Sequence, residues 1–148
     1  MTNAQTVFDI AMGMMDEVMN GLTDTSDTKE YKDRTLLILN ALAGELYPYS
    51  DTYTTDGVDG RPIVDNIRNF RAPIGLDDYI CRTVMPYGLA AHLLLDENPS
   101  AASFFQQRYE ELLRMLRAGG IPKGSEDIED VYGACGGISP YNEFSAWS

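Results

Sequence analysis

Four stretches of the chain repeat apolar residues at intervals of three and four, the spacing of one face of an α-helix. We therefore expect helices over residues 4–20, 28–47, 77–95 and 99–118. The apolar positions of the first helix are Val7, Ile10, Ala11, Met14, Met15 and Val18. The second has a wider apolar face, typical of the centre of a bundle, formed by Tyr31, Leu36, Ile38, Leu39, Leu42, Ala43, Leu46 and Tyr47.

Residues that begin helices stand ahead of three of these stretches. Asp27 is expected to cap the second helix, and Glu30 three residues later completes the capping-box spacing. Leu76-Asp77-Asp78 begins the third helix, with acidic side chains at the positive end of the helix dipole. Asn98-Pro99 begins the fourth helix as N-cap and first helical residue.

Helix-ending residues complete the pattern. Asn20-Gly21 and Gly119-Gly120 end the first and fourth helices, because both residue types tolerate the left-handed backbone conformation that closes a helix. Pro86 lies inside the third apolar pattern, where a proline removes a backbone hydrogen bond. The third helix is therefore expected to kink or to restart near Met85.

Residues 48–75 depart from helical spacing. Threonine, aspartate and glycine dominate, and the turn dipeptide Asp56-Gly57 predicts either a short β-hairpin or an irregular excursion. After it, residues 63–67 have the apolar content of a strand or helical turn packed on the bundle. The acidic residues here lack the spacing of a calcium-binding loop, so we expect no metal and no cofactor.

Residues 121–148 carry glycine, serine and acidic residues without a helical or strand period. We interpret them as an extended C-terminal tail after an all-α domain of residues 1–120. The tail either contacts partners through its aromatic side chains or folds back on its own domain. These aromatic residues are Tyr132, Tyr141, Phe144 and Trp147.

Composition and charge narrow the class of protein. A chain of 148 residues with 44% apolar residues is one domain with a real core. Its net charge of −12 gives no basic footprint for nucleic acid. Lysines and arginines are few before residue 61, whereas residues 61–120 contain seven arginines. The acidic surplus either keeps the protein soluble or pairs with arginines of neighbouring copies.

Several kinds of processing and chemistry are not indicated. Acidic residues interrupt the apolar stretch at the start of the sequence, so we expect no signal peptide there. No apolar stretch is long enough to span a membrane. The two cysteines form no disulfide framework, and Cys81 is expected to be a small buried residue. His92 has Asp96 four residues later, but no nucleophile motif accompanies it, so we predict no catalytic residue and no enzyme.

Three segments together resemble the C-terminal helical pair of head–tail connector (adaptor) or neck proteins of tailed bacteriophages. They are the helix MPYGLAAHLLL, the short acidic break DENPS and the closing pattern YEELLRML. The segments VFDIAMGMMDEV and TKEYKDRTLLILNALAGELYP are similar to proteins of Firmicute prophage structural cassettes. The excursion around DGVDGRP is longer than that family has.

The resemblance implies a virion structural protein that forms a ring below the portal and bridges it to the tail. Its partners would be copies of itself and other virion proteins, with no membrane and no sequence-specific nucleic acid. It would be found in the host cytoplasm during assembly and then in the virion. Two alternatives are an acidic decoy that mimics DNA and a helical accessory subunit of an enzyme. We expect partner contacts at Arg61, Arg68, Arg71 and Arg82 and at the four tail aromatics.

Overall fold

The computed structural model describes residues 1–19 and 25–119 of the chain. The described part is all-α, as predicted. The bounds of its elements are α1 Ala4–Met19, α2 Thr25–Leu46, η1 Tyr47–Tyr49, η2 Ile80–Val84, α3 Met85–Leu93 and α4 Pro99–Arg117. The predicted helix stop at Asn20-Gly21 and the tail of residues 121–148 lie outside the described residues.

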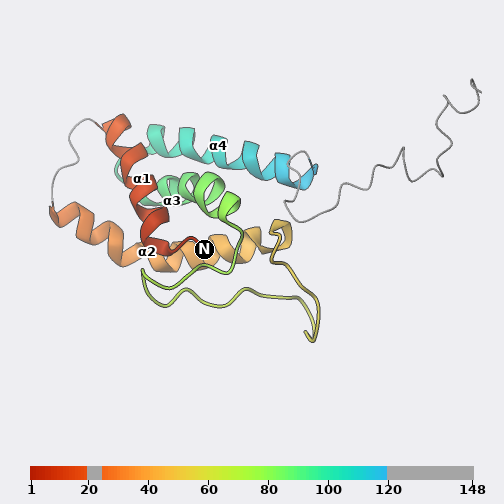
Figure 1. Ribbon diagram of the computed structural model, residues 1–148. Helices are drawn as coiled ribbons and strands as arrows, with labels where there is room; N and C mark the ends of the chain where they lie inside the picture. Colours follow the sequence, from red (N-terminus) through yellow and green to blue (C-terminus); the bar gives the residue numbers. More distant parts are fainter. Residues whose placement is uncertain (20–24, 120–148) are drawn as a thin grey trace, which may run out of the picture.

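The bundle is organised around α3, which contacts each of the other three long helices. Figure 1 shows α3 between α2 and α4, with α1 crossing over it. The centrality of α3 follows from its sequence, because MPYGLAAHL has almost no polar side chain and seven of its nine residues are buried. A helix that is apolar on nearly all sides must be covered on all sides.

Small residues on α3 allow its neighbours to come close. A Cβ atom added at Gly88 would lie 3.0 Å from a methyl carbon of Leu42 and 3.0 Å from a ring carbon of Tyr109. Leu42 belongs to α2 and Tyr109 to α4, so three helices meet at this glycine. The core extends from that point through fully buried large side chains such as Leu39 and Phe105.

The third helical segment restarts at the predicted position. One π-helical turn, η2, precedes α3, and the Met85 backbone N–H donates to the carbonyl of Ile80, five residues earlier. Pro86 has no N–H to give, so a wider turn ahead of it accommodates the missing hydrogen bond. The segment begins at Asp77, whose Oδ1 accepts a hydrogen bond from the Ile80 N–H at 2.9 Å.

The predicted ends of α4 are confirmed. The Asn98 side chain accepts from the Ala101 N–H at 3.2 Å, and Pro99 is the first helical residue. At the other end, Gly119 takes a left-handed φ of 69° and donates to the Leu116 carbonyl.

The predicted start of α2 is wrong by three residues. The helix begins at Thr25, three residues before the predicted Thr28, so Asp27 lies within the helix and not at the position before it. An acidic residue is also stabilised within the first turn of a helix, because that end of the dipole is positive. The acid therefore marks the beginning of the helix without fixing its first residue.

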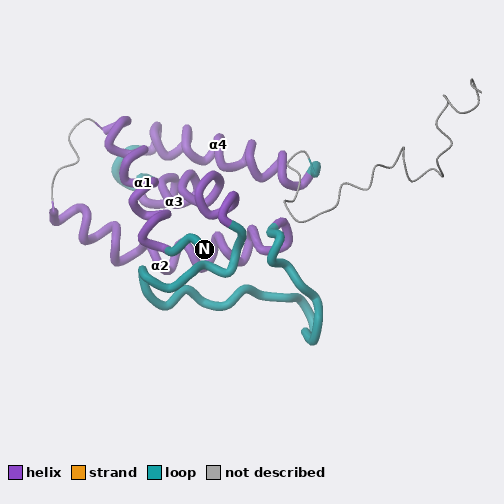
Figure 2. The backbone as a smooth tube through the Cα atoms, viewed as in Figure 1, coloured by secondary structure: helices purple, strands orange, loops and turns teal. Residues whose placement is uncertain are grey.

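The segment between η1 and η2 forms an irregular excursion, drawn as the teal loop in Figure 2. Of the two predicted alternatives, it takes the irregular one, since none of the described residues belongs to a named strand. A turn closes with Val58 N–H donating to Thr55 O, and Gly57 and Gly60 have φ of 69° and 100°. The expected strand or helical turn at residues 63–67 is absent, and Ile63 is 84% exposed while Ile67 is buried.

Within the described residues, no helix is both long and apolar enough to cross a membrane.

Candidate interaction surfaces

The excursion is fixed to the bundle by hydrogen bonds from side chains of distant residues. Asn40 of α2 makes two bonds with the backbone of Ile67: its amide donates to the carbonyl at 3.1 Å, and its Oδ1 accepts from the N–H at 2.7 Å. Near the ends of the excursion, the Ser50 hydroxyl accepts from the Asp77 N–H at 3.0 Å. The Thr52 hydroxyl donates to the Gly75 carbonyl at 2.6 Å. The excursion therefore has a defined base.

A second contact holds the later part of the excursion against α1 and α2. The Phe70 ring packs edge-on against Phe8 of α1, with 6.0 Å between centroids. The Lys32 ammonium of α2 lies 5.4 Å from the Phe70 ring centre and 5.9 Å from that of Phe8. A cation near two aromatic faces adds an electrostatic attraction to the packing.

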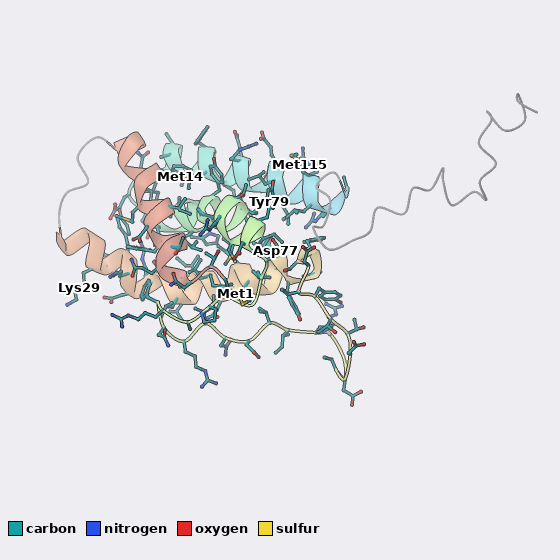
Figure 3. The ribbon with its side chains drawn as sticks, viewed as in Figure 1. Met1, Met14, Lys29, Asp77, Tyr79 and Met115 are labelled. Carbon is teal, nitrogen blue, oxygen red and sulfur yellow. The ribbon has the colours of Figure 1, made fainter. Side chains whose placement is uncertain are left out.

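The tip of the excursion projects away from the helices. In Figure 1 the backbone of this part of the excursion extends away from the bundle. All side chains from residue 51 to residue 61 are exposed. Asp77, labelled in Figure 3, stands where the chain returns from the excursion to the bundle. A segment with a fixed base and an exposed end suits contact with another molecule.

The four arginines predicted to contact partners are all exposed. Arg61, Arg68 and Arg71 come from the excursion, and Arg82 comes from η2, the next element along the chain. Among the described residues, Arg108 and Glu111 on α4 form an ion pair, and none of the four arginines forms one. The structure thus places three of the four on one exposed segment.

Asp78, close to Arg82 in sequence, is already engaged within the chain. Its Oδ1 accepts from the backbone N–H and from the hydroxyl of Thr2, both at 2.8 Å. These two hydrogen bonds stabilise the ionised carboxylate and lower its pKa below the usual 3.8; the positive charge of Arg82 acts in the same direction.

A groove runs along α4, and its first part lies between α4 and the end of α3. This upper cavity has a volume of about 410 Å³. Its floor is apolar, with Ala91, Leu95 and Ala102, while Gln106 and Glu110 stand on its α4 side. Leu95 is 62% exposed.

The groove continues towards the C-terminal end of α4. A lower cavity of about 320 Å³ shares Gln106 and Glu110 with the upper one and reaches Arg114 and Arg117. Glu45 of α2 forms the opposite wall. We call the two cavities together the α4 groove.

Tyr109 lies in the lower cavity with an unusual hydroxyl. The residue is 3% exposed, and its hydroxyl is buried without an acceptor in hydrogen-bonding geometry. Burial raises the pKa of Tyr109, and the nearby negative charge of Glu45 raises it further. The neutral hydroxyl therefore faces the Glu45 carboxylate, which acts on it as a hydrogen-bond acceptor without reaching the geometry of a full hydrogen bond.

His92 also lines the groove, but its ring is bonded locally. Its Nδ1 lies 2.8 Å from the Gly88 carbonyl oxygen, one helical turn earlier, and the ring is exposed. Within residues 1–19 and 25–119, no group of three or more His, Cys, Asp or Glu side chains is arranged to hold a metal ion. Cys81 is buried as predicted, and burial raises the pKa of its thiol to about 12.

The α4 groove is the feature that the sequence did not predict. Two features of the sequence could have indicated the groove. Leu95 is an apolar residue directly after α3, and the first turns of α4 contain small residues. Small side chains bring two helices together and leave a trough beside the contact. The four tail aromatics, Tyr132, Tyr141, Phe144 and Trp147, lie outside the described residues.

Comparisons of the chain with protein-family models, with curated proteins and with solved structures found no match.

Proposed function

We propose that this protein is a structural component of a tailed-bacteriophage virion, a connector-ring or neck protein that bridges the portal and the tail. The proposal rests on the resemblance of MPYGLAAHLLL, DENPS and YEELLRML to the connector proteins. The excursion is longer than in that family, and the observation that supports assembly is its fixed and exposed form, with three arginines that form no ion pair among the described residues. A protein that joins identical copies needs such a projecting surface, with charge that a neighbour can complement.

The positions of the acidic residues favour assembly over DNA mimicry. Exposed acids come from α1, α2, the excursion and α4, for example Asp9, Asp33, Asp59 and Glu111. A decoy that imitates DNA would be expected to gather its acids in a stripe with the charge spacing of a duplex. In a ring, the same acids would repel the DNA backbone and let a duplex pass.

The contact would be head-to-tail, with the arginines of one copy against acids of the next. A head-to-tail contact closes into a ring when its rotation permits. Exposed ion pairs contribute only ~0.2–1 kcal/mol each, so charge would set the orientation and apolar burial would supply most of the affinity.

Sedimentation of the full chain in an ultracentrifuge, across salt and protein concentration, tests the proposal. We expect association that weakens with salt, either by the protein alone or with the portal protein as template. The double charge reversal Arg68→Glu/Arg71→Glu should weaken it, whereas reversal of the exposed Lys29 to Glu on α2 should not. A monomer under every condition would remove the connector proposal and favour the decoy.

A further inference from the structure

We propose that the α4 groove is a docking site for the chain's own C-terminal segment, residues 141–148, which contains Tyr141, Phe144 and Trp147. The binding is intramolecular. It is independent of the proposed virion function, because it concerns how one copy covers its own groove.

The upper cavity has the chemistry of an aromatic pocket. Its floor of Ala91, Leu95 and Ala102 is apolar, and its volume of about 410 Å³ is within the range of sites that bind small organic groups. The Leu95 side chain is largely exposed to water, and a ligand that covers it removes this apolar surface from water, which is favourable. An aromatic side chain with a polar edge suits a pocket that has Gln106 and His92 at its border.

The lower cavity supplies a polar requirement. The Tyr109 hydroxyl is a buried donor beside the Glu45 carboxylate but outside good hydrogen-bonding geometry, and a poorly paired buried donor costs stability. A peptide lying in the groove carries a carbonyl oxygen at every residue, and one of these would accept the bond. A backbone carbonyl in the lower cavity would thus compete with Glu45 for the Tyr109 hydroxyl.

Charge and reach both favour the C-terminal segment of the same chain. Arg114 and Arg117 border the lower cavity, and residues 121–148 contain five acidic residues against one lysine. The chain leaves the bundle at Gly119, two residues after Arg117. The 19 residues of α4 span about 28 Å at 1.5 Å each. The 29 residues after Gly119 can extend to about 95 Å, so residues 141–148 reach any part of the groove.

An intramolecular segment also has an advantage over a separate peptide. A tether of this kind holds the segment at an effective concentration in the millimolar range, so even weak contacts give appreciable occupancy.

Trp147 is the only tryptophan of the chain, so its fluorescence reports the docking in the full-length protein without any label. We expect a blue-shifted emission and weak quenching by acrylamide, both unchanged when the protein is diluted. Emission of a water-exposed tryptophan at all concentrations would overturn the proposal. Burial that disappears on dilution would overturn it too, since the groove would then bind the segment of a second copy.

Two matched variants locate the site. Leu95→Glu puts a carboxylate on the apolar floor and should reduce docking by about tenfold or more, because a buried unpaired charge is costly. Leu37→Glu makes the same change at a leucine of α2 that is 75% exposed and lines neither cavity. Trp147 should become exposed in the first variant and stay buried in the second, with unchanged helical circular dichroism in both. Equal emission from the two variants would contradict the assignment of the groove.

A third variant tests the lower cavity. Tyr109→Phe removes the hydroxyl and keeps the ring in the core. If the hydroxyl donates to the docked segment, Trp147 becomes more accessible to acrylamide than in the unmodified chain. If docking is unchanged or strengthened, the hydroxyl is not a contact, and the path of the segment through the lower cavity is wrong.

Discussion

At the scale of single residues, one glycine sets how closely the helices pack. Gly88 stands where Leu42 of α2 and Tyr109 of α4 both approach α3, and it is buried. Its backbone is helical, so the absence of a side chain matters here for space and not for conformational freedom. Any added atom must displace two buried side chains from different helices.

Gly88→Val should lower the free energy of unfolding by about 1–3 kcal/mol, the usual range for overpacking a core. Gly44→Val on α2 is the control, because a Cβ there meets nothing within 4 Å. Gly44→Ala should stabilise the protein by up to about 1 kcal/mol, since glycine is a poor helix former. Denaturant unfolding measures all three. Similar losses at the two glycines would show that the close approach has little energetic weight.

Asp78 makes the protein sensitive to acid at one defined point. Its lowered pKa means that its two hydrogen bonds from Thr2 stabilise the fold fully above the ordinary pKa of 3.8. That stabilisation is lost as the pH falls through the lowered pKa of the folded state. The contribution belongs to an exposed carboxylate, so it is small and screened by salt.

Asp78→Asn should therefore melt at a lower temperature than the unmodified protein at neutral pH, and the difference should shrink as the pH falls below 3.8. Thermal melts across that range measure it. Asp65→Asn, at an exposed acid of the excursion, is the control. A difference that is constant with pH would mean that the hydrogen bonds do not depend on the charge.

At the scale of elements, the helices and the existence of the excursion were predictable, but the path of the excursion was not. The spacing of apolar residues gave all four helices, and local signals such as Asn98-Pro99 and Gly119 gave the ends of α4. Those signals depend on residues that are close in the sequence, so they can be identified from the sequence alone. The path of the excursion depends on bonds between residues 27 apart, such as Asn40 with Ile67, and no local pattern encodes them.

The same contrast applies to the candidate surfaces. Exposure of the four arginines follows from their charge, but the groove depends on how α2, α3 and α4 sit together around Gly88. The π-helical turn η2 was predictable in part. Pro86 predicts a disturbance of the helix near Met85, but the kind of turn depends on packing on both sides.

The Asn40 anchor predicts a measurable loss. Asn40→Ala leaves the N–H and carbonyl of Ile67 without their partners, which should lower the free energy of unfolding by about 1–3 kcal/mol. Asn66→Ala, at an exposed position of the same excursion, should change it by less than about 0.5 kcal/mol. Hydrogen exchange should also quicken at Ile67 in the first variant. An unchanged exchange rate there would mean that other contacts fix the excursion.

At the scale of the whole molecule, residues 1–19 and 25–119 form a shared core. Its fully buried large side chains, from Met15 to Phe105, pack against one another across all four helices. The groove lies on the surface of this core, outside the contacts that hold the helices together.

Truncation after Gly120 should leave a folded domain with a cooperative thermal melt. It should also weaken association with partners, because it removes Tyr132, which lies outside the docking segment 141–148. Calorimetry of the truncated and full chains tests the first part, and ultracentrifugation tests the second. A truncated chain without a melting transition would show that residues 121–148 complete the core, and the interpretation of the tail as a contact arm would fail.

The excursion has a practical consequence for locating the protein within a larger particle. Its base is fixed by Asn40 and Ser50, whereas the turn from Gly57 to Gly60 is exposed and far from the helices. Surface turns of this kind accept inserted sequence with little effect on folding. A peptide epitope or fluorophore placed there would have a known orientation relative to the bundle. An electron micrograph or an energy-transfer measurement could then show which way each subunit faces.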